Sequence, residues 1–392
     1  MKNKEYLNEI KYIKPKWNFI DISLIYLTNG YSNDNYKVYN KKTNEKLFLK
    51  IYKNNNNNDQ IIKLLDLNKK GYGSKILHHF KNGRIEEWFE SIPLTHNMLN
   101  SEILEKIAIE LKKFHSETEN IHYDLNFNNI LISKNNNIKF IDFEYSKLGN
   151  NKAYDIANFF IEWIYTYGKT WYNYNLKLFP SLRQIKLFCS SYLNKDINSL
   201  EVENLIDNIF IEINNTHKYW YNWSKKFKSL EYQLYGLNRL KLLNYNFREM
   251  INKEKIIYAD GTFDLCHMGH ISFFEKIKKL GCRKLIIGVI SDENVNSYKR
   301  FPIINLDNRV KFLENISLID KVIKDCPFNQ ITNKFLNDNG IDLVIYGGDP
   351  NDKNPSKKWE YHYQIPNEEN ILKMIEYSGL ESTSNIIKRI QG

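Results

Sequence analysis

Apolar and polar residues follow two different periods along this chain, and the changes of period predict its elements. In the C-terminal third, residues 284–291 (KLIIGVIS) form an unbroken apolar run, which is typical of a strand covered on both faces. Shorter runs at residues 321–324 and 342–346 alternate with segments of helical spacing. The pattern predicts an α/β domain built on a parallel sheet.

The preceding part of the chain mixes short strands with amphipathic helices. Residues 46–52 (KLFLKIY) and 82–90 (NGRIEEWFE) have the character of strands, and residues 103–115 carry apolar side chains at helical spacing. We expect the N-terminal segment to be poor in helix. A helix at residues 230–246, followed by a charged stretch, places a boundary near residue 252, so the predicted domains are residues 1–252 and 253–392.

A strand, a tight loop and a helix start are predicted within residues 257–270 (IYADGTFDLCHMGH). The N-terminus of a helix offers unpaired backbone N–H groups and a partial positive charge, which together suit a phosphate. His267 and His270 can both point at that phosphate, and Gly269 allows a close approach of the backbone. The stretch predicts a nucleotide site with two imidazole donors.

A second motif lies at residues 122–129 (HYDLNFNN) and 138–145 (IKFIDFEY). Four residues separate Asp124 from Asn129. The catalytic loop of kinases has the same spacing between two residues: an aspartate, which accepts the substrate hydroxyl proton, and an asparagine, which holds a metal. Asp142 ends an apolar strand, where it can bridge magnesium to nucleotide phosphates. The two segments predict phosphoryl transfer.

A lysine and a group of aromatic residues are weaker candidates in the same domain. Lys50 follows a glycine-containing loop, as the ATP-binding lysine of kinases does, although a solvent-facing lysine is the commoner alternative. The helix after it offers only Asp59 and Asp66 in place of the usual glutamate partner. Ring faces hold quaternary ammonium groups, so a cage for an amino alcohol is one interpretation of the later aromatic residues and a packed core is the other. The candidates are Trp220, Trp223, Tyr232 and Tyr235.

These motifs resemble two known families. The kinase-type segments, together with GYGSKIL, GRIEEW and DIANFFIEW, resemble the choline and ethanolamine kinases, which are related to the aminoglycoside phosphotransferases. A protein kinase is disfavoured because DFE replaces DFG. The DGTFD and HMGH residues resemble the signature of cytidylyltransferases that join CTP to phosphocholine, phosphoethanolamine or glycerol 3-phosphate. The implied fold is α/β: a bilobal, protein-kinase-like α+β domain, then a Rossmann-like HxGH nucleotidyltransferase domain with a parallel sheet.

The resemblances imply roles for individual residues. In the kinase, Asp124 is the base, Asn129 and Asp142 ligate Mg²⁺, and Glu144 lies near the substrate. In the transferase, His267, His270 and Lys299 are catalytic. The implied nucleotide-binding positions are Lys50 for ATP and Gly261, Thr262, Phe263, Asp292, Arg309, Asp349, Ser382 and Thr383 for CTP, with bracing of a dimer as an alternative for Arg309. The implied ammonium cage of the transferase is Phe328 with Trp359 or Tyr361.

Two departures from the cytidylyltransferase pattern predict weaker CTP binding. The arginine and the glycine that the family carries before Ser382 are missing, although Ser382, Thr383 and Ser384 remain as N-cap residues of a last helix. Where the family often has two acids, only Asp349 is left.

Composition and charge exclude other classes of protein. The net charge is +10, but the lysines are scattered, so a nucleic-acid partner is disfavoured. Four cysteines without a CxxC motif predict a reducing compartment. Because no apolar run of 18 residues occurs, we expect a cytoplasmic protein without a stable membrane anchor. No amphipathic tail follows the transferase segment before Gly392, so we expect no control by a lipid-sensing helix of that kind.

The sequence therefore predicts a bifunctional enzyme. One domain phosphorylates choline or ethanolamine with ATP and Mg²⁺, and the other transfers CMP from CTP to the product, with aromatic density favouring choline. The family resemblance implies a homodimer through the cytidylyltransferase domain. One alternative is that only one domain is active and the other is a degenerate nucleotide-binding or regulatory module. The other is a tRNA synthetase-like enzyme, which the absence of a KMSKS motif disfavours.

Overall fold

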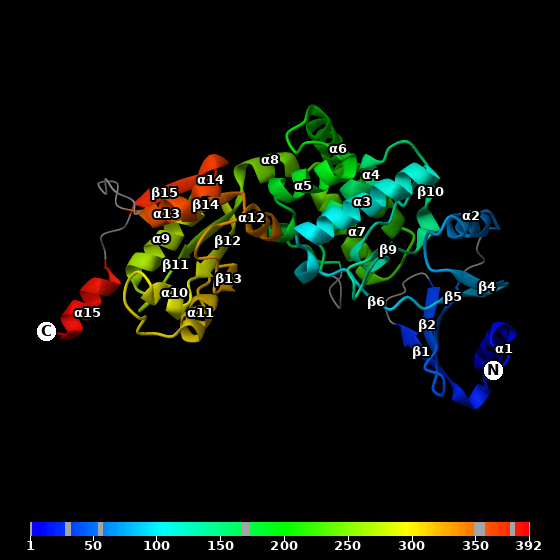
Figure 1. The fold of residues 1–392 in the computed structure, drawn as a ribbon. Coiled ribbons are helices and arrows are strands. Elements are labelled where there is room, and N and C mark those ends of the chain that lie inside the picture. The colour runs from blue at the N-terminus through cyan, green and yellow to red at the C-terminus, as the bar shows by residue number, and fades with distance from the viewer. Residues whose placement is uncertain are drawn as a thin grey trace. The chain divides into compact units, whose positions relative to one another are not determined.

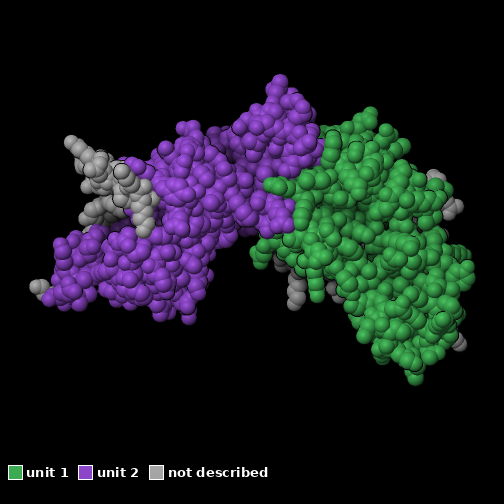
Figure 2. Space-filling model, viewed as in Figure 1, with its two compact units in different colours: residues 1–98, 105–163, 211–216 green, residues 99–104, 164–210, 217–392 purple. Residues whose placement is uncertain are grey.

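The structure is a computed structural model of the 392-residue chain that describes residues 2–27, 33–53, 58–166, 172–348, 357–376 and 381–391. The chain divides into two compact units, coloured separately in Figure 2. The first unit contains residues 1–98, 105–163 and 211–216, and the second contains residues 99–104, 164–210 and 217–392. Each unit is described by itself.

The first unit begins with a helix that packs on an antiparallel sheet of five strands in the order β1-β2-β3-β5-β4 (Figure 1). The helices and strands that lie in this unit, in whole or in part, are α1 (Lys2–Ile13), β1 (Ile22–Leu27), β2 (Asn33–Asn40), β3 (Lys46–Tyr52), α2 (Asn58–Lys69), β4 (Ile76–Phe80), β5 (Gly83–Glu87), β6 (Ser91–Pro93), α3 (Ser101–Thr118), β7 (Asn120–Ile121), β8 (Ile130–Ser133), β9 (Ile138–Phe140), β10 (Lys147–Leu148), α4 (Ala153–Glu162) and α6 (Leu200–Ser224). The expectation of a helix-poor N-terminus is wrong, because Ile10 of α1 is fully buried against the sheet beside Val38.

Strand β3 shows how the sheet separates its apolar and polar residues. Side chains alternate between the two faces of a strand. Leu47, Leu49 and Ile51 enter the core below the sheet, so Lys50 projects from the other face. Ile85 of β5 joins the same core, which places its neighbour Arg84 on the face that carries Lys50.

A buried carboxylate holds the loop between β7 and β8. Asp155 of α4 has no exposed surface. One of its oxygens accepts hydrogen bonds from the backbone N–H of His122 at 2.6 Å and from Nε2 of His115 at 2.9 Å. The other oxygen accepts the N–H of Tyr123 at 2.8 Å, a residue whose φ of 66° lies in the left-handed region. Charge-assisted bonds of this kind offset the cost of the unusual backbone.

The second unit combines helices with a parallel sheet of five strands in the order β13-β12-β11-β14-β15 (Figure 1). Its further helices and strands are α5 (Leu182–Leu193), α7 (Leu230–Leu242), α8 (Phe247–Lys253), β11 (Lys255–Gly261), α9 (Met268–Lys278), β12 (Cys282–Val289), α10 (Asp292–Asn296), α11 (Leu306–Glu314), β13 (Lys321–Lys324), α12 (Asn333–Asn339), β14 (Leu343–Gly348), α13 (Lys357–His362), α14 (Gln364–Glu368), β15 (Leu372–Glu376) and α15 (Thr383–Gln391). The predicted parallel sheet is confirmed.

Both faces of this sheet are buried, which explains its continuous apolar runs. Ile257 and Ala259 of β11 pack on one face with residues of α9 and α11. Ile256 and Tyr258 pack on the other face with Leu336 of α12. The loop after β11 is thereby fixed at the carboxyl edge of the sheet, where parallel sheets place their ligand sites.

The predicted boundary near residue 252 lies where α8 ends and β11 begins, and it stays a prediction. The second unit includes earlier residues because they contact the parallel sheet. Arg283 of β12 donates hydrogen bonds to the carbonyl oxygens of Leu176 and Phe179 at 3.0 and 2.6 Å. Within the described residues, no helix combines the length and the apolar character needed to cross a membrane.

The hydrogen bonds of Asp155 generate a stability prediction. In Asp155→Asn, one carboxylate oxygen becomes an NH₂ group that faces an N–H donor, and the charge is lost. We expect the free energy of unfolding to fall by about 2–4 kcal/mol. Urea denaturation measures the loss. Asp66→Asn, which changes an exposed acid on α2, serves as the matched control. Equal stability of the two variants would contradict the role assigned to Asp155.

Candidate active sites

Asp124 and Asn129 lie side by side in the loop that Asp155 holds. Asn129 donates from its side-chain nitrogen to the Asp124 carboxylate at 3.0 Å and to the Asp124 carbonyl oxygen at 2.8 Å. Asn126 donates to the other carboxylate oxygen at 2.8 Å. Burial raises the pKa of Asp124 well above its usual range, a rise that the hydrogen bond from Asn126 opposes and the charge of Asp142 increases. A raised pKa makes this carboxylate a stronger base toward a hydroxyl group.

Asn129 and Asp142 meet at one end of the β8–β9 hairpin. Ile130 pairs with Phe140, and the N–H of Ile141 donates to the carbonyl oxygen of Asn129 at 3.0 Å. Asp142 follows in the left-handed conformation, with φ of 62° and ψ of 57°. Strained backbone of this kind is concentrated at functional sites.

These two side chains fit a Mg²⁺ ion that arrives with a nucleotide. Because the Asn129 nitrogen is committed to Asp124, its amide oxygen is available as a ligand. Mg²⁺ binds through one or two protein oxygens and completes its shell with water and phosphate oxygens. The predicted metal role of Asn129 and Asp142 is compatible with this geometry and stays a prediction.

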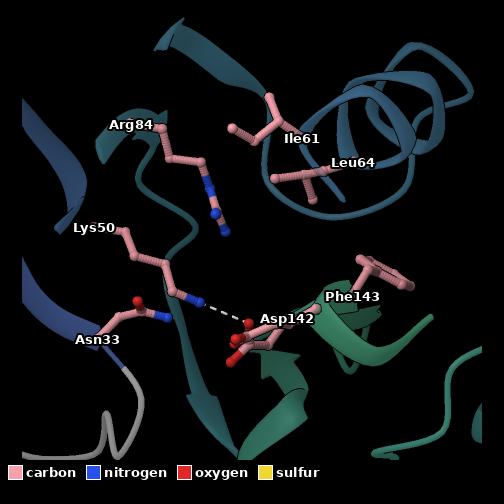
Figure 3. A pocket seen from close by; sticks show the side chains of 8 residues that line it. Asn33, Lys50, Ile61, Leu64, Arg84, Asp142 and Phe143 are labelled. Atoms are coloured by element: carbon pink, nitrogen blue, oxygen red, sulfur yellow. Dashed lines mark hydrogen bonds and ion pairs between the residues drawn. The ribbon is translucent and has the colours of Figure 1, made fainter. Parts of the chain in front are cut away.

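Lys50 and Glu144 share a cavity with Asp142. Figure 3 shows the Lys50 side chain directed at Asp142. The Lys50 ammonium lies 2.6 Å from Asp142 Oδ1. Burial acts to raise the pKa of Asp142, but the charge and hydrogen bond of Lys50, together with the charges of Arg84 and His122, lower it below its usual value. Burial and the charge of Asp142 raise the pKa of Glu144. Lys50 is therefore buried in the cavity rather than solvent-facing, and Glu144 lies beside it.

The helix partner expected for Lys50 is not found among the described side chains of α2. Asp66 pairs with Lys70, the residue after the end of α2, at 3.6 Å. The side chain of Asp59 lies outside the described residues. Lys50 is paired instead with the carboxylate of Asp142.

Glu162 is a buried acid whose charge acts on Asp124, and it belongs to neither of the predicted motifs. Its side chain is buried at the end of α4, and its charge contributes to the raised pKa of Asp124. It follows Asp155 by seven positions, so both lie on one helix face. The sequence feature that could have identified Glu162 is an acidic residue within the largely apolar segment DIANFFIEW.

The four candidate cage residues of the second unit pack on one another. Trp223 contacts Trp220, Tyr232 and Tyr235, with ring centroids 5.3, 5.4 and 6.4 Å apart. The guanidinium group of Arg239 lies over Tyr235, 4.8 Å from the ring centroid. The aromatic residues thus form the packed cluster that was the alternative interpretation, and their cage role stays a prediction.

The imidazoles of His267 and His270 lie together at the start of α9, with ring centroids 4.0 Å apart. Nδ1 of His267 accepts the N–H of Gly269 at 3.1 Å, and Nδ1 of His270 accepts the N–H of His267 at 3.3 Å. A neutral imidazole has one acceptor nitrogen and one N–H group. The network therefore assigns the proton to Nε2 in both rings.

Both histidines are neutral near pH 7. Burial lowers the pKa of His267. Burial, followed by the charges of His267 and Lys299, lowers the pKa of His270 to about 4. Lys299, which is exposed, is thus one of the charges that act on His270. Two N–H donors and one cation thus gather at a helix N-terminus, as anion binding requires.

The loop between β11 and α9 is built for close packing. A Cβ on Gly261 would lie 3.2 Å from the ring of Phe263, which has a φ of 53° and packs edge-on against His270. The Thr262 hydroxyl lies 3.1 Å from the hydroxyl of Tyr298. Of these three predicted nucleotide positions, Phe263 contacts the histidine pair, and the nucleotide role of all three stays a prediction.

Arg309 and Asp292 brace the loops of the site. Arg309 is only 1% exposed. It donates to the carbonyl oxygens of Ile304 and Ile290, both at 2.9 Å, to that of Thr262, and to Asp292. Asp292 also accepts the N–H of Leu306 at 3.0 Å. The guanidinium group is thus committed to protein acceptors rather than extended toward a ligand.

Helix α15 meets the histidine pair. Ser382 caps the helix by accepting the N–H of Asn385 at 3.1 Å, as predicted. The Thr383 hydroxyl donates to the carbonyl oxygen of Asp264 at 2.9 Å and lies 3.5 Å from His267 Nε2. A Cβ on Gly269 would lie 2.7 Å from the carbonyl oxygen of Glu381, so only glycine fits there. Asp349 lies outside the described residues.

A buried carboxylate and aromatic rings lie near the same edge of the sheet. Asp260 accepts hydrogen bonds from His362 Nε2 and from the hydroxyl of Tyr363, both at 2.7 Å. Tyr298 contacts Phe328 and Trp359, with centroids 5.6 and 5.5 Å apart. Tyr361, the alternative cage residue, is 55% exposed. His362 and Tyr363 beside Asp260, and Tyr298 beside Phe328 and Trp359, were not predicted, because only the fold brings them together.

The lowered pKa of His270 generates a pH prediction. Because its folded pKa is about 4 and the usual value is 6.5, its contribution to stability is complete above pH 6.5 and is lost as pH falls toward 4. Between pH 7 and pH 4.5, the unfolding free energy of the wild type should fall by about 1–3 kcal/mol more than that of His270→Asn. Urea denaturation at both pH values measures this difference. Parallel pH curves would contradict it.

Comparison with known protein families divides the chain in two. The choline/ethanolamine kinase family matches residues 24–121 and 116–244, which together span more than half of the chain. The cytidylyltransferase-like family matches residues 258–389. Both predicted resemblances are confirmed.

Individual relatives agree with this division. An ethanolamine-phosphate cytidylyltransferase of Dictyostelium discoideum is 34% identical over 139 residues, which cover 35% of this chain and 38% of the relative. The enzyme of that name from Mus musculus is 32% identical over 140 residues, covering 35% and 34%. The chain thus spans little more than a third of the length of these relatives.

A solved structure shows the fold of the kinase part. The crystal structure of choline kinase from Cryptosporidium parvum Iowa II superposes with a TM-score of 0.54 at 19% identity, covering 64% of this chain and 96% of that one. The predicted kinase-like fold is confirmed. The chain belongs to the choline/ethanolamine kinase family, and residues 258–389 add a cytidylyltransferase-like region to it.

Proposed function

We propose that this protein makes a CDP-amino alcohol in two steps, with ATP and CTP as co-substrates. The observation that carries the proposal is that two sites for phosphate chemistry occur on one chain. One joins Asp124, Asn129, Asp142 and Lys50, and the other joins His267 and His270 with Lys299 nearby. The product of the first site is the substrate of the second.

In the first step, Asp124 accepts the proton of the amino-alcohol hydroxyl as the hydroxyl oxygen attacks the γ-phosphorus of ATP, and ADP leaves as the bond from this phosphorus to the β–γ bridging oxygen breaks. Lys50 neutralises phosphate charge. Asn129 and Asp142 would hold Mg²⁺, which supplies further charge neutralisation when bound. Glu162 is buried, and its charge contributes to the raised pKa of Asp124. It offers a carboxylate, in addition to Asp124, for the ammonium group of the amino alcohol.

In the second step, an oxygen of the phosphorylated amino alcohol attacks the α-phosphorus of CTP, and pyrophosphate leaves. The Nε2–H groups of His267 and His270 donate to phosphate oxygens where charge builds up. Lys299 neutralises the two anions as they meet. The neutral rings act as hydrogen-bond donors rather than as cations.

The amino-alcohol end of the transferase site is assigned to Asp260 and the rings around it. A primary ammonium donates hydrogen bonds to a carboxylate, whereas a quaternary one needs ring faces. Asp260 is a carboxylate held in position by hydrogen bonds from His362 and Tyr363, which favours the primary ammonium of ethanolamine. The name of the relatives, ethanolamine-phosphate cytidylyltransferase, favours the same substrate. The ring contacts of Tyr298, Phe328 and Trp359 favour choline.

We place the enzyme in the cytoplasm and propose that it forms a homodimer through the cytidylyltransferase-like part. Four free cysteines support a reducing compartment. Exposed apolar side chains at Phe301, Ile303 and Phe312, each more than half accessible, support a contact with a second copy.

A coupled assay tests the proposal. The purified chain is incubated with ATP, CTP, Mg²⁺ and either ethanolamine or choline, and both the phosphorylated amino alcohol and the CDP product are measured by mass spectrometry. We expect both products, with ethanolamine turned over faster than choline. Absence of any CDP-amino alcohol would contradict the proposed function.

Single substitutions should separate the two steps. Asp124→Asn should lower the kinase rate at least about 100-fold because the base is lost, and leave the transferase rate unchanged. His267→Ala should lower the transferase rate about 100- to 1,000-fold and leave the kinase unchanged. Each variant is the control for the other. A wild-type chain with only one of the two activities would support the alternative of a degenerate module.

A further inference from the structure

Two cations face each other across the β3–β5 strand pair. Lys50 and Arg84 are direct partners in the antiparallel register, and both project from the face opposite the core. Like charges in directly opposite positions destabilise a sheet. The arrangement therefore needs anionic groups on this face.

The structure supplies one carboxylate for each cation. Lys50 is 2.6 Å from Asp142. Arg84 donates from Nε to Glu86 at 2.5 Å and from Nη1 to the hydroxyl of Tyr52 at 3.2 Å. Arg84 and Glu86 are 7% and 8% exposed, so the pair is held in a fixed and largely dry position.

Arg84 also reaches the cavity that contains the metal candidate Asp142. Arg84, Lys50, Asn33 and Glu144 line this cavity with Asp142, and Figure 3 shows the guanidinium group extending into it. Lys50 is 2.6 Å from Asp142 and Arg84 lines the same cavity, so both charges act on the same volume. A nucleotide with Mg²⁺ brings several phosphate charges into that volume.

Resting on the proposed kinase function, we propose that Arg84 is a second cation for the nucleotide phosphates and that Glu86 is its positioning residue. Kinases position the β3 lysine through a glutamate on the following helix. In the described side chains of α2, Asp66 pairs with Lys70 instead. Strand β5 instead supplies a second cation, Arg84, which the neighbouring carboxylate of Glu86 holds in position. A guanidinium group binds phosphate oxygens with directional N–H donors.

The test measures nucleotide affinity and catalysis separately. Arg84→Met removes the charge and keeps much of the volume, Arg84→Lys restores the charge, and Glu86→Gln removes the positioning carboxylate. Glu87→Gln is the matched control, because Glu87 is the next residue on β5 and is exposed beside Lys75. Titration calorimetry with Mg-ADP gives the affinity, kinase kinetics give the KM for ATP, and thermal unfolding gives the stability.

We expect Arg84→Met to weaken Mg-ADP binding and raise the KM for ATP about 10- to 100-fold. Arg84→Lys should recover part of this loss, Glu86→Gln should weaken binding severalfold, and Glu87→Gln should match the wild type. The transferase rate of each variant should stay at the wild-type value, which shows that the second unit is unaffected, and thermal unfolding shows whether the first unit has folded.

Two results overturn the inference. The first is an Arg84→Met variant with a lower melting temperature but a Kd and KM within twofold of the wild type, since the ion pair would then be structural only. The second is an Arg84→Lys variant that recovers stability without recovering affinity. A wild-type chain that binds Mg-ADP but phosphorylates neither amino alcohol would refute the kinase step alone, because nucleotide binding would still report on Arg84.

Discussion

The alternation of side chains along a β-strand is the constraint on which both sites depend. In β3 it sends Leu47, Leu49 and Ile51 into the core and leaves Lys50 on the opposite face. In β11 it covers both faces with apolar side chains, so the loop that carries the histidines leaves the sheet at one fixed edge. The apolar positions that stabilise each sheet thereby determine where its charged groups lie.

The parts of the sites that could be predicted from the sequence are those carried by contiguous segments. The spacing of Asp124 and Asn129 fixes a loop whose hydrogen bonds are local. His267 and His270 are brought together by one turn of helix, and Ser382 caps the helix that it begins. Such contacts follow from local geometry, which a motif records directly.

The remaining contacts join residues that are distant in the sequence. Asp260 meets His362 across 102 positions, and Arg84 faces Lys50 only because of the strand register. Arg309 belongs to a pattern that predicts a ligand contact, yet its guanidinium group holds three loops together. The aromatic residues around Trp223 could not be divided between core and cage, because both uses require the same side chains.

The proton positions on the histidine pair have a consequence for metal poisoning. Two histidines three residues apart commonly bind zinc or copper, which need an unprotonated ring nitrogen. Here the acceptor nitrogens are Nδ1, and backbone N–H groups occupy both. A zinc ion could bind Nε2 only if the proton moved to Nδ1, where it would oppose the N–H of Gly269 and undo the helix cap. The same hydrogen bonds that present two donors to a phosphate therefore protect the site against adventitious transition metals.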